Sequence, residues 1–114
     1  MLISDLSPSV SIRKQFLWSE NRDVPAVAGC YAIASYDLLV LYVGLATKSI
    51  KARMADHLDS AEKRRGAGLV LPYWFYFRTF ASQEVHAVER GWLNESILRD
   101  GKFPPLNHAH SPIS

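Results

Sequence analysis

Residues 29–44 read GCYAIASYDLLVLYVG, and this stretch decides the fold of the chain. Residues 29–35 and 39–44 are rich in β-branched, aromatic and other apolar side chains, which favour extended strands. Only Tyr36-Asp37-Leu38 separates the two runs, and a connection of that length is typical of a β-hairpin. The sequence therefore predicts two paired antiparallel strands at the centre of the fold.

The flanking sequence predicts one more strand and further helices. Residues 72–80, PYWFYFRTF, have the strongest strand pattern in the chain. Residues 49–64 and 82–98 have the three- and four-residue apolar spacing of amphipathic helices, and residues 11–19 predict a shorter helix. The order β-β-α-β-α of the main elements predicts an α+β fold, in which helices flank a three-stranded antiparallel sheet.

Composition and length describe one ordinary globular domain. The 114 residues are 48% hydrophobic and 21% charged, which is sufficient for a hydrophobic core. No apolar run approaches the ~18 residues of a membrane helix, and the N-terminus lacks the pattern of a secretory signal. The single cysteine, Cys30, rules out an internal disulfide and is typical of a reducing compartment. We therefore expect a cytoplasmic protein that has no membrane partner.

The basic residues are unevenly distributed. The net charge is only +2, yet six of the thirteen basic residues lie within residues 48–65. Acidic residues in the same segment offset part of this charge, so a solvated helix face is one interpretation. The other is a nucleic-acid contact surface. Its candidate members are Lys48, Lys51, Lys63, Arg64 and Arg65.

Glu89 occupies a position where helical periodicity expects an apolar side chain. Val85, Trp92 and Leu93 define an apolar stripe on the helix predicted over residues 82–98, and Glu89 projects within that stripe. A carboxylate on a buried face needs a partner, because an isolated buried charge is costly. A salt bridge to an arginine and a bound metal ion both satisfy this requirement.

Four other side chains are candidates for a shared site. Tyr31 and Tyr42 lie on the two strands of the hairpin and can approach each other across it. Arg53 and His57 are four residues apart on the following helix and share one side, at the margin between core and solvent. Each has a structural alternative: the tyrosines as ordinary strand residues, His57 as a surface histidine, and Arg53 as an ion-pair partner of Glu89.

Taken in order, these residues resemble the motif of the GIY-YIG nuclease family. The matching elements are Gly29-Cys30-Tyr31, Tyr42-Val43-Gly44, Arg53, Glu89 and Asn107. The resemblance covers about residues 24–107, so we expect one domain over 1–114 with its core at 24–107 and an N-terminal extension at 1–23.

The chain departs from the family pattern in two places. Many members have a lysine directly after the second glycine, where this chain has Leu45, and Lys48 is a candidate substitute. The spacing from Tyr42 to Arg53 is also one residue longer, which we assign to the turn at residues 46–48, since turns tolerate insertions.

The resemblance implies a metal-dependent endonuclease that hydrolyses DNA phosphodiester bonds. By similarity to the family, Glu89 is the sole protein ligand of one Mg²⁺ or Mn²⁺ ion, and Arg53 binds the phosphate. Tyr31 is the expected general base or water-orienting group, and Tyr42 positions other groups in the site. His57 is a rival proton acceptor, because the ordinary pKa of histidine is near ~6.5. The resemblance also implies that Gly29, Gly44 and Asn107 support the structure of the site. Asn107 is expected to do so through hydrogen bonds to backbone groups.

Two other functions remain open from the sequence. The first is a catalytically weak or inactive nucleic-acid-binding module that keeps the fold, which Leu45 favours. The second is a structural interaction domain in which Arg53 and Glu89 form an internal ion pair. The sequence does not determine the substrate structure, the choice between DNA and RNA, or the oligomeric state.

Overall fold

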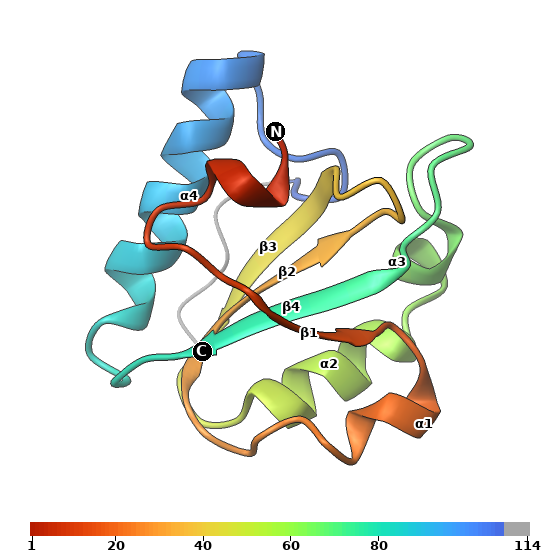
Figure 1. Ribbon diagram of the computed structural model, residues 1–114, viewed down its shortest axis with the longest axis vertical. Helices are drawn as coiled ribbons and strands as arrows, with labels where there is room; N and C mark the ends of the chain where they lie inside the picture. Colours follow the sequence, from red (N-terminus) through yellow and green to blue (C-terminus); the bar gives the residue numbers. More distant parts are fainter. Residues whose placement is uncertain (109–114) are drawn as a thin grey trace.

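A computed structural model of the chain describes residues 1–108 and has the predicted hairpin at its centre (Figure 1). Strands β2 (Gly29–Ala34) and β3 (Val40–Ala46) pair antiparallel, with Tyr31 opposite Gly44. Strand β4 (Trp74–Thr79) pairs antiparallel with the other side of β2. The predicted α+β class is therefore confirmed, and β2 is an inner strand of the sheet.

The sheet has four strands, in the order β1-β4-β2-β3, and not the three that the sequence predicted. The additional strand β1 (Ile12–Gln15) pairs antiparallel with β4. The helix predicted over residues 11–19 is thus wrong, since this segment contains β1 and the start of the short helix α1 (Trp18–Asn21). Tertiary contact explains the difference, because Arg13 lies over the Trp74 ring at 3.7 Å from its centroid and donates to the Tyr76 hydroxyl at 3.0 Å.

The helix predicted over residues 49–64 is divided in two. Helix α2 (Ile50–Leu58) begins at its N-cap Ser49, whose side chain accepts a hydrogen bond from the Ala52 amide. Helix α3 (Ala61–Arg65) follows, and its own N-cap Ser60 accepts from the Lys63 amide. A second capping serine therefore restarts the helix in a new direction.

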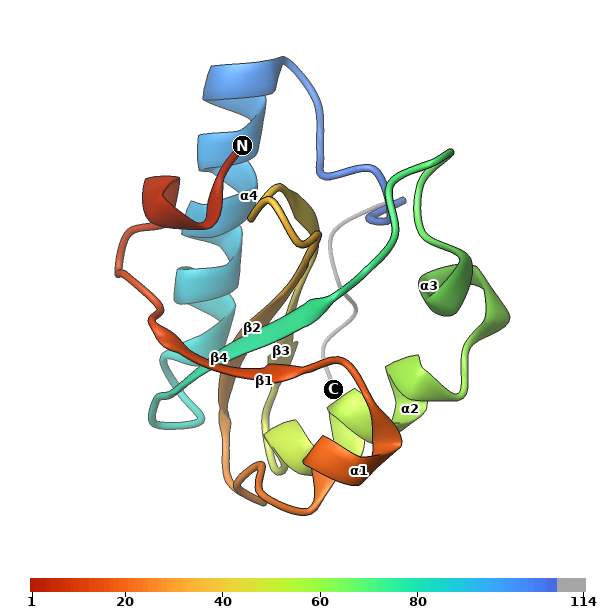
Figure 2. The ribbon, with the colours of Figure 1, turned by 45° about the vertical axis from the view of Figure 1, so that its right-hand side comes forward.

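Helix α4 (Val85–Asp100) ends at Gly101, where the left-handed backbone, with φ of 73°, favours glycine. It covers one face of the sheet, whereas α1 and α2 cover the other (Figures 1 and 2). Side chains of β2 alternate between these layers, as the two-residue period of a strand requires. Cys30 packs with Trp92 and Leu93 of α4, and Tyr31 packs with Met54 of α2.

Residues 1–23 contribute to both the core and the sheet. The first ten residues bury Ile3, Leu6 and Val10 in the cluster beneath α4 and include the 3₁₀ helix η1 (Ile3–Asp5). Residues 1–23, which the resemblance assigned to an extension outside the domain core, therefore complete the hydrophobic core beneath α4. Within residues 1–108, no helix has the length and apolar character needed to cross a membrane.

Candidate active site

Tyr31 is the centre of the candidate site. Its side chain is completely buried and lies against Gly44 of the paired strand. A Cβ atom at position 44 would lie 2.6 Å from both Cζ and the hydroxyl of Tyr31, so only glycine leaves space for the ring. Gly29 is equally constrained, because a Cβ there would lie 2.3 Å from the carbonyl oxygen of Arg78. Both motif glycines thus permit close approach of other groups.

The Tyr31 hydroxyl lies between His57 and Arg53 of α2. Its oxygen is 2.7 Å from Nε2 of His57 and accepts a hydrogen bond of 3.4 Å from Nε of Arg53. The Tyr42 ring completes the group, at 4.8 Å from the His57 ring and 6.3 Å from the Tyr31 ring. Tyr31, Tyr42 and His57 are therefore in mutual contact, and Arg53 joins them through the Tyr31 hydroxyl.

Burial sets the protonation states of this group. It raises the pKa of Tyr31 above the ordinary value, and Arg53 offsets this only in part. Burial, with smaller effects of Lys63 and Arg53, lowers the pKa of His57 to about 3. Near neutral pH both side chains are therefore uncharged. Tyr31 donates its proton to Nε2 of His57 in the tautomer that carries the imidazole proton on Nδ1, and in either tautomer its oxygen accepts from Arg53.

The sequence predicted that Arg53 and His57 both lie at the margin between core and solvent. This is confirmed for Arg53 and wrong for His57. The Arg53 side chain is 32% exposed and lies 3.6 Å from Asp56 at the surface. His57 is 7% exposed, because the Tyr31 and Tyr42 rings enclose it. Its ordinary pKa, on which the prediction of a rival proton acceptor rested, therefore does not apply in the folded protein.

Glu89 is buried on α4, as its place in the apolar stripe predicted. Cys30 connects it to β2: the thiol donates to the Val85 carbonyl at 3.3 Å, and the Glu89 backbone also hydrogen-bonds to the sulfur. Burial raises the pKa of Cys30 to about 12, and the Glu89 carboxylate contributes to that rise. The same carboxylate makes a smaller contribution to the raised pKa of Tyr31. Glu89 therefore acts electrostatically on the hydroxyl group from the α4 layer.

Glu89 is a lone buried carboxylate among the described residues and not a member of a cluster of metal-ligating side chains. Within residues 1–108 there is no cluster of three or more histidine, cysteine, aspartate or glutamate side chains able to hold a metal ion. The buried Oε2 atom of Glu89 accepts no hydrogen bond from these residues, although the side chain does interact with other groups. One carboxylate with several waters is a common Mg²⁺ environment, so a cation here would depend on Glu89 and water.

A cavity of about 200 Å³ lies beside Arg53, between the end of β3 and the start of α2. Lys48 and Arg53 both line it, which makes it a positively charged recess. Leu45 does not contribute to this recess, since its side chain is buried in the cluster beneath α4. Lys48 is the basic side chain that lines this recess together with Arg53.

Asn107 attaches the C-terminal tail to the edge of the sheet. Its side chain accepts from the amide and donates to the carbonyl of Val43, each at 2.9 Å. The Leu106 amide donates to the Leu41 carbonyl at 2.9 Å, so the tail follows β3 on its outer edge. The predicted hydrogen bonds from Asn107 to backbone are confirmed, and they hold the strand that carries Tyr42.

Lys63 joins the site in a way that the sequence did not indicate. Its ammonium lies 4.6 Å from the centre of the Tyr42 ring, and its charge helps to lower the pKa of His57. Arg64 and Arg65 are exposed on the same short helix, and Lys51 lies on the adjacent α2, 3.5 Å from the Arg22 carbonyl. Ser60 is the N-cap of α3, and the change of direction there brings Lys63 to the Tyr42 ring of β3. A serine that can cap a second helix is the sequence signal for this break.

Comparison of the chain with models of known protein families found no match, and neither did comparison with curated proteins.

Proposed function

We propose that the chain is a metal-dependent endonuclease of the GIY-YIG type that hydrolyses DNA phosphodiester bonds. One observation carries this proposal: the buried Tyr31 hydroxyl is held by Arg53 and His57 against Gly44. A tyrosine with only a packing role needs neither a charged donor nor a glycine beneath its ring. Of the motif residues, Tyr31 and Arg53 are joined by a hydrogen bond, and His57 extends that group.

The chemistry follows from what each side chain can do. Arg53, with Lys48 across the same recess, binds the scissile phosphate and offsets its negative charge. Tyr31 orients the attacking water. In the general-base route, the Tyr31 oxygen takes a proton from that water while its own proton passes to Nε2 of His57. Glu89 would hold a Mg²⁺ or Mn²⁺ ion, which would supply positive charge to stabilise the transition state when bound.

A catalytically weak nucleic-acid-binding module is the second candidate, and three observations favour it. The Tyr31 hydroxyl is fully buried, so a substrate reaches it only if Arg53 moves aside. A His57 pKa of about 3 makes this histidine a poor proton acceptor in the metal-free state. Leu45 also removes a basic group that many family members have.

Incubation of the purified chain with plasmid and branched DNA separates the two candidates. We expect cleavage with Mg²⁺ or Mn²⁺ and none with EDTA, because the proposed site needs a cation. Salt-sensitive binding without cleavage under any metal condition would favour the binding module. A parallel reaction with RNA of the same sequence determines which nucleic acid is the substrate.

A further inference from the structure

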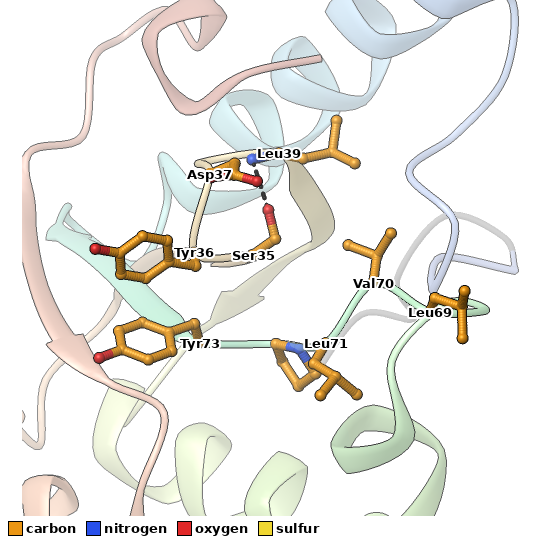
Figure 3. Close-up of a pocket in the computed structure, with 9 residues that line it drawn as sticks. Ser35, Tyr36, Asp37, Leu39, Leu69, Val70, Leu71 and Tyr73 are labelled. Atoms are coloured by element: carbon orange, nitrogen blue, oxygen red, sulfur yellow. Dashed lines mark hydrogen bonds between the residues drawn. The ribbon is translucent and has the colours of Figure 1, made fainter.

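A second cavity lies apart from the candidate active site, between the β2–β3 turn and the connection from α3 to β4 (Figure 3). Its volume is about 500 Å³, within the range of about 300–1,000 Å³ that is usual for small-ligand sites. Tyr36 and Tyr73 form one side, with ring centroids 5.1 Å apart, and Leu69 and Leu71 line the other. Aromatic and aliphatic walls of this kind accommodate a flat apolar group.

These apolar side chains are unusually exposed. Tyr36 is 68% exposed, Leu71 is 62% exposed, and Leu69 at the tip of the connection is fully exposed. The backbone nevertheless has a defined shape, because the amides and carbonyls of Ala67 and Val70 pair reciprocally at 2.9 Å. Gly66 is required there, since a Cβ would lie 2.2 Å from the Val70 carbonyl oxygen. A constrained loop that exposes apolar groups is typical of an interaction site.

The surrounding charges indicate which ligand fits. Helix α3 ends in Lys63, Arg64 and Arg65 and precedes the loop directly, so a basic segment leads into the loop that lines the cavity. Asp37 is the charged residue among those that line the cavity, and its carboxylate disfavours a phosphate inside it. A carboxylate instead accepts hydrogen bonds from an exocyclic amino group of a nucleobase. Phosphates beside the cavity and a base within it match this distribution of charge.

We propose that this cavity binds an unstacked nucleobase of a DNA strand whose phosphates lie along α3. The inference rests on the proposed function and deepens it, since it specifies the substrate class as DNA that contains an unpaired or unstacked base. Lys63 connects the two sites, because it lies on α3 and also over the Tyr42 ring. The exposed ring of Tyr36 provides the stacking surface.

Fluorescence anisotropy in EDTA, where the metal needed for cleavage is removed, tests the proposal. The probes are two labelled DNA duplexes of equal length, one fully paired and one with a single bulged 2-aminopurine. We expect the wild-type chain to bind the bulged duplex about tenfold more tightly, which is within the range of base–aromatic stacking. Tyr36→Ala should remove most of this preference and leave binding to the paired duplex unchanged. Binding should also quench the 2-aminopurine fluorescence in the wild type only.

The matched control is Trp18→Ala, which removes an aromatic side chain of 56% exposure on α1, outside the residues that line the cavity. It should preserve the preference for the bulge, and thermal unfolding should show that both variants are folded. Equal wild-type affinity for the two duplexes, or an equal loss for both in Tyr36→Ala, would overturn the base pocket. So would a dimer in sedimentation that dissociates in Leu71→Ser, because a second copy would then occupy the cavity.

The outcomes distinguish this proposal from the nuclease. Metal-dependent cleavage without a preference for the bulged duplex would contradict the base pocket and support the nuclease. If the chain never cleaves DNA but binds the bulged duplex more tightly in a way that depends on Tyr36, the base pocket would be supported and the nuclease contradicted. Absence of DNA binding would contradict both.

Discussion

The Tyr31 hydroxyl and Nε2 of His57 lie 2.7 Å apart in a region of the protein that excludes solvent. Both groups are uncharged near neutral pH, because burial moves the pKa of the phenol upward and that of the imidazole downward. In the resting protein the pair is therefore a neutral hydrogen bond, and proton transfer from Tyr31 to His57 is disfavoured because the two pKa values are moved apart. Loss of either partner leaves a buried polar atom without its hydrogen bond, which makes the pair sensitive to substitution.

Tyr31→Phe tests this hydrogen bond. The substitution keeps the ring but leaves the buried Nε2 of His57 without its partner, so we expect the free energy of unfolding to fall by about 1–3 kcal/mol. Any DNA cleavage should fall at least about a hundredfold. The control is Tyr73→Phe, which removes a surface hydroxyl bonded to Gln15 and should change stability by less than about 0.5 kcal/mol. Full activity in Tyr31→Phe would exclude a direct role of this hydroxyl.

Gly44→Ala tests the requirement for space beneath the Tyr31 ring. The added Cβ would contact the ring at 2.6 Å, so we expect a loss of about 1–3 kcal/mol and impaired cleavage. The matched control is Gly91→Ala on α4, where a Cβ would meet nothing within 4 Å. That change should stabilise the helix by about 0.5–1 kcal/mol. Chemical denaturation of both variants checks the prediction, and equal effects would contradict it.

Glu89→Gln separates a metal ligand from a structural charge. If Glu89 holds a cation, the substitution should abolish Mg²⁺-dependent cleavage while the fold and most DNA binding persist. If Glu89 is instead one member of a structural ion pair, the same change breaks that pair within the buried layer and stability should fall by about 3–5 kcal/mol. Thermal unfolding and DNA cleavage, measured on one preparation, distinguish the two. An early-melting variant of a wild-type chain that never cleaves DNA would support the ion pair.

The pH dependence of stability tests the burial of His57. Its folded pKa of about 3 lies below its unfolded value, so the unfolded chain binds more protons between these values. The stabilisation is therefore complete above about pH 6.5, and it is lost as the pH falls toward 3. We expect a slope of up to about 1.4 kcal/mol per pH unit in urea denaturation between pH 6.5 and 5. His57→Gln should flatten this slope, and an unchanged slope would show that other groups cause it.

Salt titration of DNA binding tests the basic segment. Simultaneous change of Lys63, Arg64 and Arg65 to alanine should weaken binding to all sequences and reduce the slope of log K against log salt. Each lost phosphate contact should lower the slope by about 0.9. Comparison with the double variant Arg78→Ala/Arg90→Ala, which removes two basic side chains outside residues 48–65, identifies the surface involved. A slope that changes only in the double variant would move the DNA path away from α3.

Local patterns were sufficient for much of the sheet and for the buried carboxylate. The hairpin of β2 and β3 follows from two β-rich runs and a short connection, and Glu89 is buried because its helical neighbours are apolar on the same face. Asn107 is also where the motif suggested, bonded to the backbone of the edge strand. In these places, the local preference and the tertiary environment agree.

By itself, the sequence thus determined the α+β class, the central hairpin, the amphipathic faces of α2 and α4 and the residues of the candidate site. Only the tertiary structure decided that residues 12–15 form a strand, because pairing with β4 outweighs a weak local helix pattern. It also decided that Ser60 redirects α3 so that Lys63 reaches Tyr42. The low pKa of His57 arises in the same way, since burial depends on side chains from β2 and β3 that periodicity along one helix does not reveal.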